Sequence, residues 1–143
     1  MLVKPLRFAM VFFGTGLVLM LISWALARVV GAGVPFGAIA ILPPICAALV
    51  EGTQYGRATG QVMPSGPAWR DAAILTVLVA AMNAVLLLPL LNFEALRSGE
   101  VLLPWATLAM FGLGFLAVVF LVIRLFLFFG SRNAVLAGQR PDR

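Results

Sequence analysis

The sequence contains no histidine, one cysteine and only five acidic residues among its 143 residues. The lack of histidine excludes a Ser-His-Asp triad, a Cys-His pair and an imidazole ligand to zinc or haem iron. Cys46 has no disulfide partner within the chain, and we interpret it as a small apolar residue on a helix face. The sequence also shows no phosphate-binding loop, metal-ligand spacing or paired-carboxylate site. It therefore predicts a protein that is not an enzyme and has no cofactor other than structural lipids.

Charged residues are scarce as well. Only 10% of the residues are charged, 63% are hydrophobic, and the mean hydropathy is +1.11. A soluble domain carries about a quarter charged residues, so this chain has too little polar surface to cover itself in water. We therefore predict an all-α integral membrane protein. Its net charge of +5 then indicates contacts to anionic lipid headgroups rather than nucleic-acid binding.

Four long apolar stretches predict a single domain, a four-helix transmembrane bundle, because about 20 helical residues cross a hydrocarbon core of about 30 Å. We expect spans at about residues 8–28, 33–59, 71–91 and 104–130, with a loop at 60–70, another at 92–103 and a polar tail at 131–143. Ala25-Leu26-Ala27 resembles a signal-peptide cleavage site, but the apolar run before it is longer than the roughly 7–15 residues of a signal peptide. We expect the first span to be retained.

The second span contains the tandem Pro43-Pro44. Proline removes a backbone donor and clashes with the preceding turn, so this pair kinks or breaks a helix. Two geometries fit the sequence. In the first, a kinked span runs from about Gly33 to Val50. In the second, a helix starts near Pro44, after a separate piece at residues 34–42, and runs past Glu51 towards Thr59. The favoured prediction is a kinked helix that continues beyond Glu51 and stops at Gly60.

Basic and aromatic residues predict the orientation in the membrane. Four spans place both termini on one side, together with most of the basic residues: Lys4, Arg7, Arg57, Arg70, Arg124, Arg132, Arg140 and Arg143. Only Arg28 and Arg97 lie on the other side. Because basic residues are retained in the cytoplasm, we predict a multi-pass membrane protein with both termini cytoplasmic. The expected interfacial anchors are Trp24 and Trp105 outside and Tyr55 and Trp69 inside.

Two stripes of small residues predict close helix packing. The third span carries Ala72, Thr76, Ala80 and Ala84, and the second carries Ala48, Gly52, Gly56 and Gly60. Small residues let helix backbones approach within van der Waals distance, which drives helix association in lipid. These faces pack either against other helices of the same chain or against another integral membrane protein.

Asn83, Glu51 and Arg124 are polar residues that we single out within the predicted spans, where such residues are uncommon. We expect Asn83, near the middle of the third span, to form a hydrogen bond with another helix. Glu51 and Arg124 lie at similar depths near the inner interface, and we expect them to approach each other. Arg70 is the alternative partner for Glu51. A competing expectation is that both side chains reach separately to the headgroups.

The residues around Glu51 also resemble a known family. The pattern P-x-I-C-A-A-x-x-x-G-x-x-Y-G-R-x-x-G-x-x-x-P, which closes on A-W-R-D-A, is similar to that of small four-helix bacterial inner-membrane proteins without an assigned activity. The matching residues are Pro44, Ala47, Ala48, Gly52, Arg57, Gly60, Pro64, Trp69 and Arg70. This resemblance implies the same topology and a location in the bacterial inner membrane, with both termini cytoplasmic, and it implies no mechanism. Small multidrug transporters share the size and helix count, but the first span here lacks their membrane-embedded glutamate.

These features predict a non-catalytic accessory, assembly or stabilising subunit of a larger membrane protein complex. The alternative is a small oligomeric transporter or channel, with Asn83, Glu51, Arg124 and Pro43-Pro44 along its path. These groups would face one shared cavity in a transporter and separate packed interfaces in a subunit. A lipid-binding role for the basic cytoplasmic face is a third hypothesis.

Overall fold

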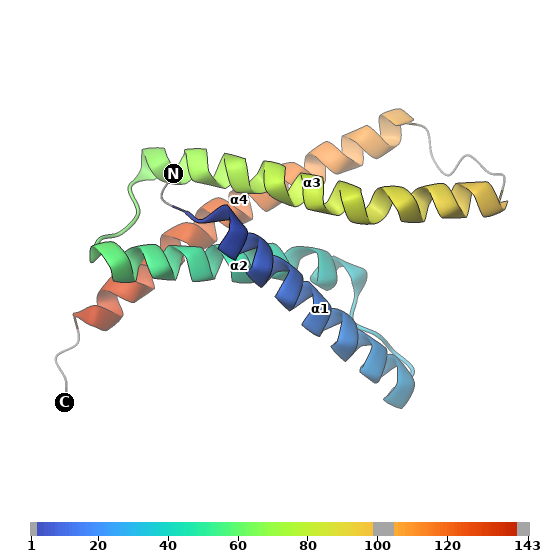
Figure 1. Ribbon diagram of the computed structural model, residues 1–143, viewed down its shortest axis with the longest axis horizontal. Coiled ribbons are helices and arrows are strands. Elements are labelled where there is room, and N and C mark those ends of the chain that lie inside the picture. Colours follow the sequence, from blue (N-terminus) through green and yellow to red (C-terminus); the bar gives the residue numbers. More distant parts are fainter. Residues whose placement is uncertain (1–2, 99–104, 140–143) are drawn as a thin grey trace.

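The computed structural model describes residues 3–98 and 105–139, and all regular secondary structure in these ranges is helical (Figure 1). The helices are α1 (Pro5–Val29), α2 (Phe36–Thr59), α3 (Ser65–Ser98) and α4 (Trp105–Gly138). Each contains a stretch that is long and apolar enough to cross a membrane. The prediction of an all-helical chain with four such helices is therefore confirmed.

The helices run back and forth between two ends of the molecule. The start of α1, the α2–α3 loop and the end of α4 lie at one end, which we call the terminal end (Figure 1). The α1–α2 loop lies at the opposite end. Among the described residues, the most extensive contact is between α2 and α4, followed by that between α1 and α2. The helix crossing of α2 and α4 is therefore the centre of the fold.

α2 is one continuous helix through Pro43 and Pro44 that extends beyond Glu51, as the favoured prediction expected, and it does not start near Pro44. Neither proline has an N–H group to donate to the preceding turn. Both are buried, and a Cβ placed on Gly16 of α1 would lie 4.0 Å from Pro43 Cγ, so this part of α2 packs against α1. The helix ends at Gly60, whose φ of 64° is in the left-handed region that glycine adopts without a steric penalty.

α3 and α4 are longer than the predicted spans. α3 begins at Ser65 and continues to Ser98, so the first part of the expected loop at 92–103 is helical. Pro67 is compatible with this start because it lies in the first turn, where a missing N–H group costs little. α4 continues to Gly138, so residues 131–138, expected in a polar tail, are also helical. The remaining residues of the expected loop and tail that fall at 99–103 and 140–143 lie outside the described residues.

The core is concentrated towards the terminal end. Phe8 of α1, Ala48 of α2, Leu75 of α3 and Leu127 of α4 are all fully buried. Towards the opposite end α1 diverges from α2 (Figure 1). Large apolar side chains are exposed there, including Leu17 and Met20 on α1 and Met110, Phe111 and Leu113 on α4. The bundle is thus closely packed at one end and open at the other.

Candidate functional site

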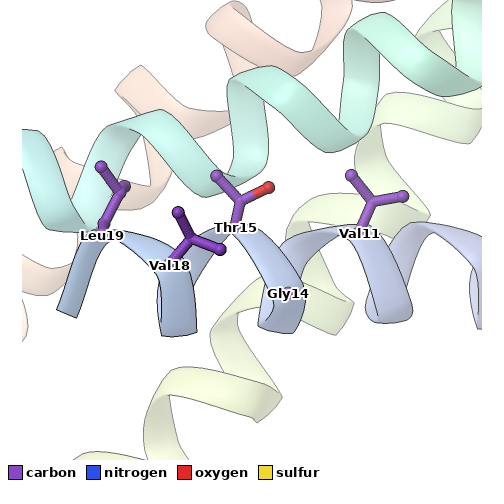
Figure 2. A pocket seen from close by; sticks show the side chains of 5 residues that line it. All are labelled: Val11, Gly14, Thr15, Val18 and Leu19. Carbon is purple, nitrogen blue, oxygen red and sulfur yellow. The ribbon is translucent and has the colours of Figure 1, made fainter. Parts of the chain in front are cut away.

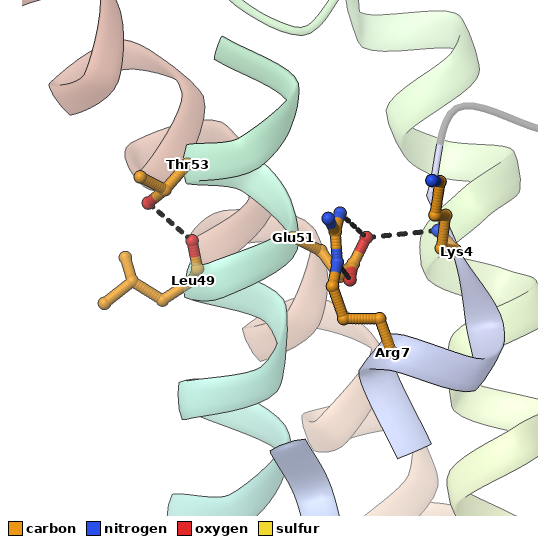
Figure 3. A network of polar contacts seen from close by, with 5 residues as sticks. All are labelled: Lys4, Arg7, Leu49, Glu51 and Thr53. Atoms are coloured by element: carbon orange, nitrogen blue, oxygen red, sulfur yellow. Dashed lines mark hydrogen bonds and ion pairs between the residues drawn. The ribbon is translucent and has the colours of Figure 1, made fainter. Parts of the chain in front are cut away.

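Glu51 is a buried carboxylate, only 1% exposed, that joins α2 to the start of α1. Arg7 donates through Nε to Oε1 at 2.5 Å and through Nη2 to Oε2 at 2.9 Å (Figure 3). Oε2 also accepts the backbone N–H group of Lys4 at 3.1 Å. A carboxylate buried in a bundle needs such partners because desolvation of an ion costs several kcal/mol. The two parallel bonds from Arg7 also fix the relative position of the two helices.

The expected pairing of Glu51 with Arg124 or Arg70 is therefore wrong. Sequence reasoning missed Arg7 because it treated the basic start of the chain as a segment outside the first span. α1 begins at Pro5, with Lys4 in the N-cap position. Proline at the first helical position is a recognised start signal. That signal would have placed Arg7 inside the helix, where it could face α2.

Arg124 lies within α4 and contacts the start of α3 instead. Its Nη2 donates to Ser65 Oγ at 3.5 Å, and its Cζ lies 5.2 Å from the centre of the Trp69 ring. This is the distance of a cation–π contact. Trp69 also packs against Phe120, with their ring centres 5.3 Å apart. Nε of Arg124 is buried and has no hydrogen-bond acceptor among the described residues.

The glycine face of α2 packs directly against the backbone of α4. A Cβ at Gly52 would overlap the carbonyl oxygen of Leu127, and one at Gly56 would lie 2.5 Å from that of Ser131. On α4, a Cβ at Gly130 would lie 2.5 Å from the carbonyl oxygen of Leu49. Real Cβ atoms essentially never approach an oxygen so closely. Glycine at these three positions therefore sets the distance between the two helices, and Ala48, fully buried, continues the same face.

Gly130 and Ser131 belong to this crossing, and sequence reasoning did not select them. It interpreted Gly130 as the end of the fourth span and Ser131 as the start of the tail. Ser131 is fully buried, and its Oγ accepts the N–H group of Met63 at 3.1 Å and donates to the carbonyl of Phe128 at 2.9 Å. The adjacent small residues Gly130-Ser131 were the available signal, because they match the small residues of α2.

The stripe on α3 runs from the core to the surface. Ala72 is fully buried, and Thr76 is 9% exposed and donates to the carbonyl of Ala72 at 2.8 Å. Ala80 is half-buried and Ala84 is exposed. Asn83 Nδ2 donates to the carbonyl of Val79 at 2.9 Å, within the same helix. This bond replaces the interhelical bond that the sequence led us to expect.

The expected interfacial aromatics lie at both ends of the molecule. Trp24 is exposed near the end of α1, with the guanidinium of Arg28 5.2 Å from its ring centre. Trp69 is 46% exposed near the start of α3, and Tyr55 is half-buried on α2. Trp105 begins α4, and its side chain lies outside the described residues.

A shallow apolar cavity of about 400 Å³ lies along α1 (Figure 2). Its lining consists of Val11, Gly14, Thr15, Val18 and Leu19. Figure 2 shows Val11, Thr15 and Leu19 directed towards α2. The Thr15 hydroxyl is the only polar side-chain group of this lining, which therefore suits a hydrocarbon chain better than a polar substrate. Within residues 3–98 and 105–139, no group of three metal-ligating side chains comes together.

The three polar residues selected from the sequence thus have separate partners: Glu51 contacts Arg7, Arg124 contacts Trp69, and Asn83 bonds within its own helix. The chain was compared with protein-family models, with curated proteins and with solved structures. None of them matches it.

Proposed function

We propose that the protein is an accessory, assembly or stabilising subunit of a larger inner-membrane protein complex. The separation of its polar groups is the observation that supports this function. A transport path requires polar groups that face one water-accessible cavity. Here Glu51 is bonded to Arg7, Asn83 to its own helix, and Arg124 to Ser65. None of these residues, and neither Pro43 nor Pro44, lines the cavity on α1.

The open end of the bundle supports a partner that is itself an integral membrane protein. An added Cβ would meet no atom within 4 Å at Gly14 on α1 or at Gly112 and Gly114 on α4. Both helices expose large apolar side chains around these glycines. Glycine on an apolar helix face allows another helix backbone to approach closely. A helix face that meets only lipid gains nothing from glycine at these positions. We propose that transmembrane helices of the partner pack at this end.

The proposed location is the bacterial inner membrane, with the terminal end in the cytoplasm. Exposed basic residues at the terminal end include Lys4, Arg57, Arg70 and Arg132. Such residues are retained on the cytoplasmic side. We expect a reporter that is active only in the periplasm to be inactive when fused to the C-terminus, and a cytoplasmic reporter at the same place to be active. The opposite pattern would contradict the orientation.

The subunit function is tested by purifying the tagged protein from its native membrane in a mild detergent. We expect a stoichiometric, larger integral membrane protein to co-purify, as read by native gel and mass spectrometry. Gly112→Leu is expected to reduce co-purification because its side chain would fill the space offered to the partner. Val77→Leu, at an exposed position of α3, is the control and should not. A clean homo-oligomer would contradict the proposal and make transport the next assay.

A further inference from the structure

We propose that Arg124, Ser65 and Trp69 form a binding site for the phosphate group of an anionic phospholipid at the terminal end of the bundle. This inference rests on the proposed membrane insertion but not on the subunit function. It is carried by the unused hydrogen-bond donors of Arg124, by the charges around them and by the exposed tryptophan beside them.

Arg124 has more donors than the protein satisfies. A guanidinium carries five N–H donors and is permanently charged. Among the described residues, Ser65 Oγ accepts from it at 3.5 Å, which is a long hydrogen bond, and buried Nε has no acceptor. Buried polar groups normally have a partner, and leaving a charged one without a partner is costly. A phosphate group supplies several acceptor oxygens and matches the planar fork of arginine. It would bind the Nη groups, because Nε is shielded from any ligand outside the protein.

The carboxylates at the terminal end form their described ion pairs with arginines other than Arg124. At the terminal end the described carboxylates are Glu51 and Asp71, which are 1% and 0% exposed. Glu51 is bonded to Arg7, and Asp71 Oδ1 lies 3.4 Å from Nε of Arg70. Because both acids are buried and already contact arginine, the described surface here is positively charged. A positive surface at a membrane boundary attracts anionic lipids.

Trp69 indicates that the ligand is a lipid rather than a soluble anion. Trp69, on α3, is 46% exposed, and its ring contacts the guanidinium of Arg124 and the ring of Phe120, which lie one turn apart on α4. Exposed tryptophan is enriched at the headgroup level of membranes, where one side of the ring is apolar and the other is wet. A phosphate bound beside this ring would lie at the depth of the phosphodiester groups. The apolar surface of α4 between this site and the opposite end of the bundle would meet the acyl chains.

The test uses the full-length protein in detergent and native mass spectrometry with phosphatidylglycerol or phosphatidylcholine of the same acyl chains. We expect the wild-type protein to retain phosphatidylglycerol preferentially and Arg124→Gln to lower its affinity about tenfold, the effect of losing a charged hydrogen-bond donor. Arg124→Lys should restore only part of the affinity because an ammonium lacks the planar fork. Arg132→Gln removes an exposed arginine from the same helix and should change it less than about threefold.

Three results would overturn the site. They are equal retention of both lipids by the wild type, equal losses in Arg124→Gln and Arg132→Gln, and complete displacement of lipid by millimolar inorganic phosphate, which would indicate a site for free anions. Circular dichroism would show whether Arg124→Gln still folds. If it does not, Ser65→Ala decides, since it removes only a hydroxyl and should weaken lipid retention without unfolding the helix. None of these results depends on whether a protein partner co-purifies.

Discussion

Replacing Gly52 with alanine is expected to lower the free energy of unfolding by about 2–3 kcal/mol, the upper part of the range for overpacked sites. The added Cβ would overlap the carbonyl oxygen of Leu127 and crowd the Cα of the same residue. Backbone atoms cannot rotate away as a flexible side chain does, so α2 and α4 would have to move apart. That movement would also loosen the contacts of Gly56 and Gly130.

This loss can be measured by SDS titration in lipid micelles, followed by circular dichroism. Gly114→Ala is the matched control because a Cβ there meets no atom within 4 Å. It should be neutral or stabilise the helix by up to about 1 kcal/mol, since alanine favours helix more than glycine does. Equal effects of the two substitutions would show that α2 and α4 are not in close contact at Gly52.

Replacing Arg7 with methionine is expected to destabilise the bundle by about 2–3 kcal/mol, less than the 3–5 kcal/mol of a fully buried pair. The expected loss of stability is smaller because the side chain of Arg7 is 31% exposed, so that water already solvates part of the ion pair. The substitution would leave Glu51 buried with only the N–H group of Lys4 among its present partners. The loss should therefore appear as separation of the start of α1 from α2.

The double variant distinguishes a lost attraction from an isolated buried charge. Adding Glu51→Gln to Arg7→Met should recover part of the stability, because the remaining group would be neutral. Arg57→Met, at an exposed position of α2, is the control and should change the free energy of unfolding by less than about 0.5 kcal/mol. Additive losses in the double variant would show that Glu51 and Arg7 do not interact.

The helices could be predicted from the sequence because the length and hydropathy that a helix needs to cross a membrane are easily recognised. α1 and α2 begin and end within a few residues of the expected limits, where Pro5 and Gly60 are local signals. The end of α4 could not be predicted in the same way. A glycine at position 130 is compatible with the end of a helix and also with close packing against another helix. Only the contact of Gly130 with Leu49 decides between these two roles.

The side-chain partners were harder to predict than the helices. Depth in the membrane can be estimated from position along a span, and it placed Glu51, Arg70 and Arg124 near one another. Which side of each helix faces which neighbour depends on the rotation of the helices. In this bundle that rotation follows from the crossing at Gly52 and directs Glu51 towards Arg7. A single sequence contains no direct measure of it.

The pairing of α2 with α4 also has a consequence for the order in which the chain assembles. The ribosome completes Gly52 and Gly56 well before Leu127, Gly130 and Ser131, which occupy the last of the four helices. Until that helix is made, the glycine face of α2 has no α4 backbone to pack against, while Arg7 and Glu51 can already join α1 to α2. Contacts so distant in sequence form late. We therefore expect the newly made protein to pair α1 with α2 first and to leave the glycine face of α2 uncovered until α4 packs against it.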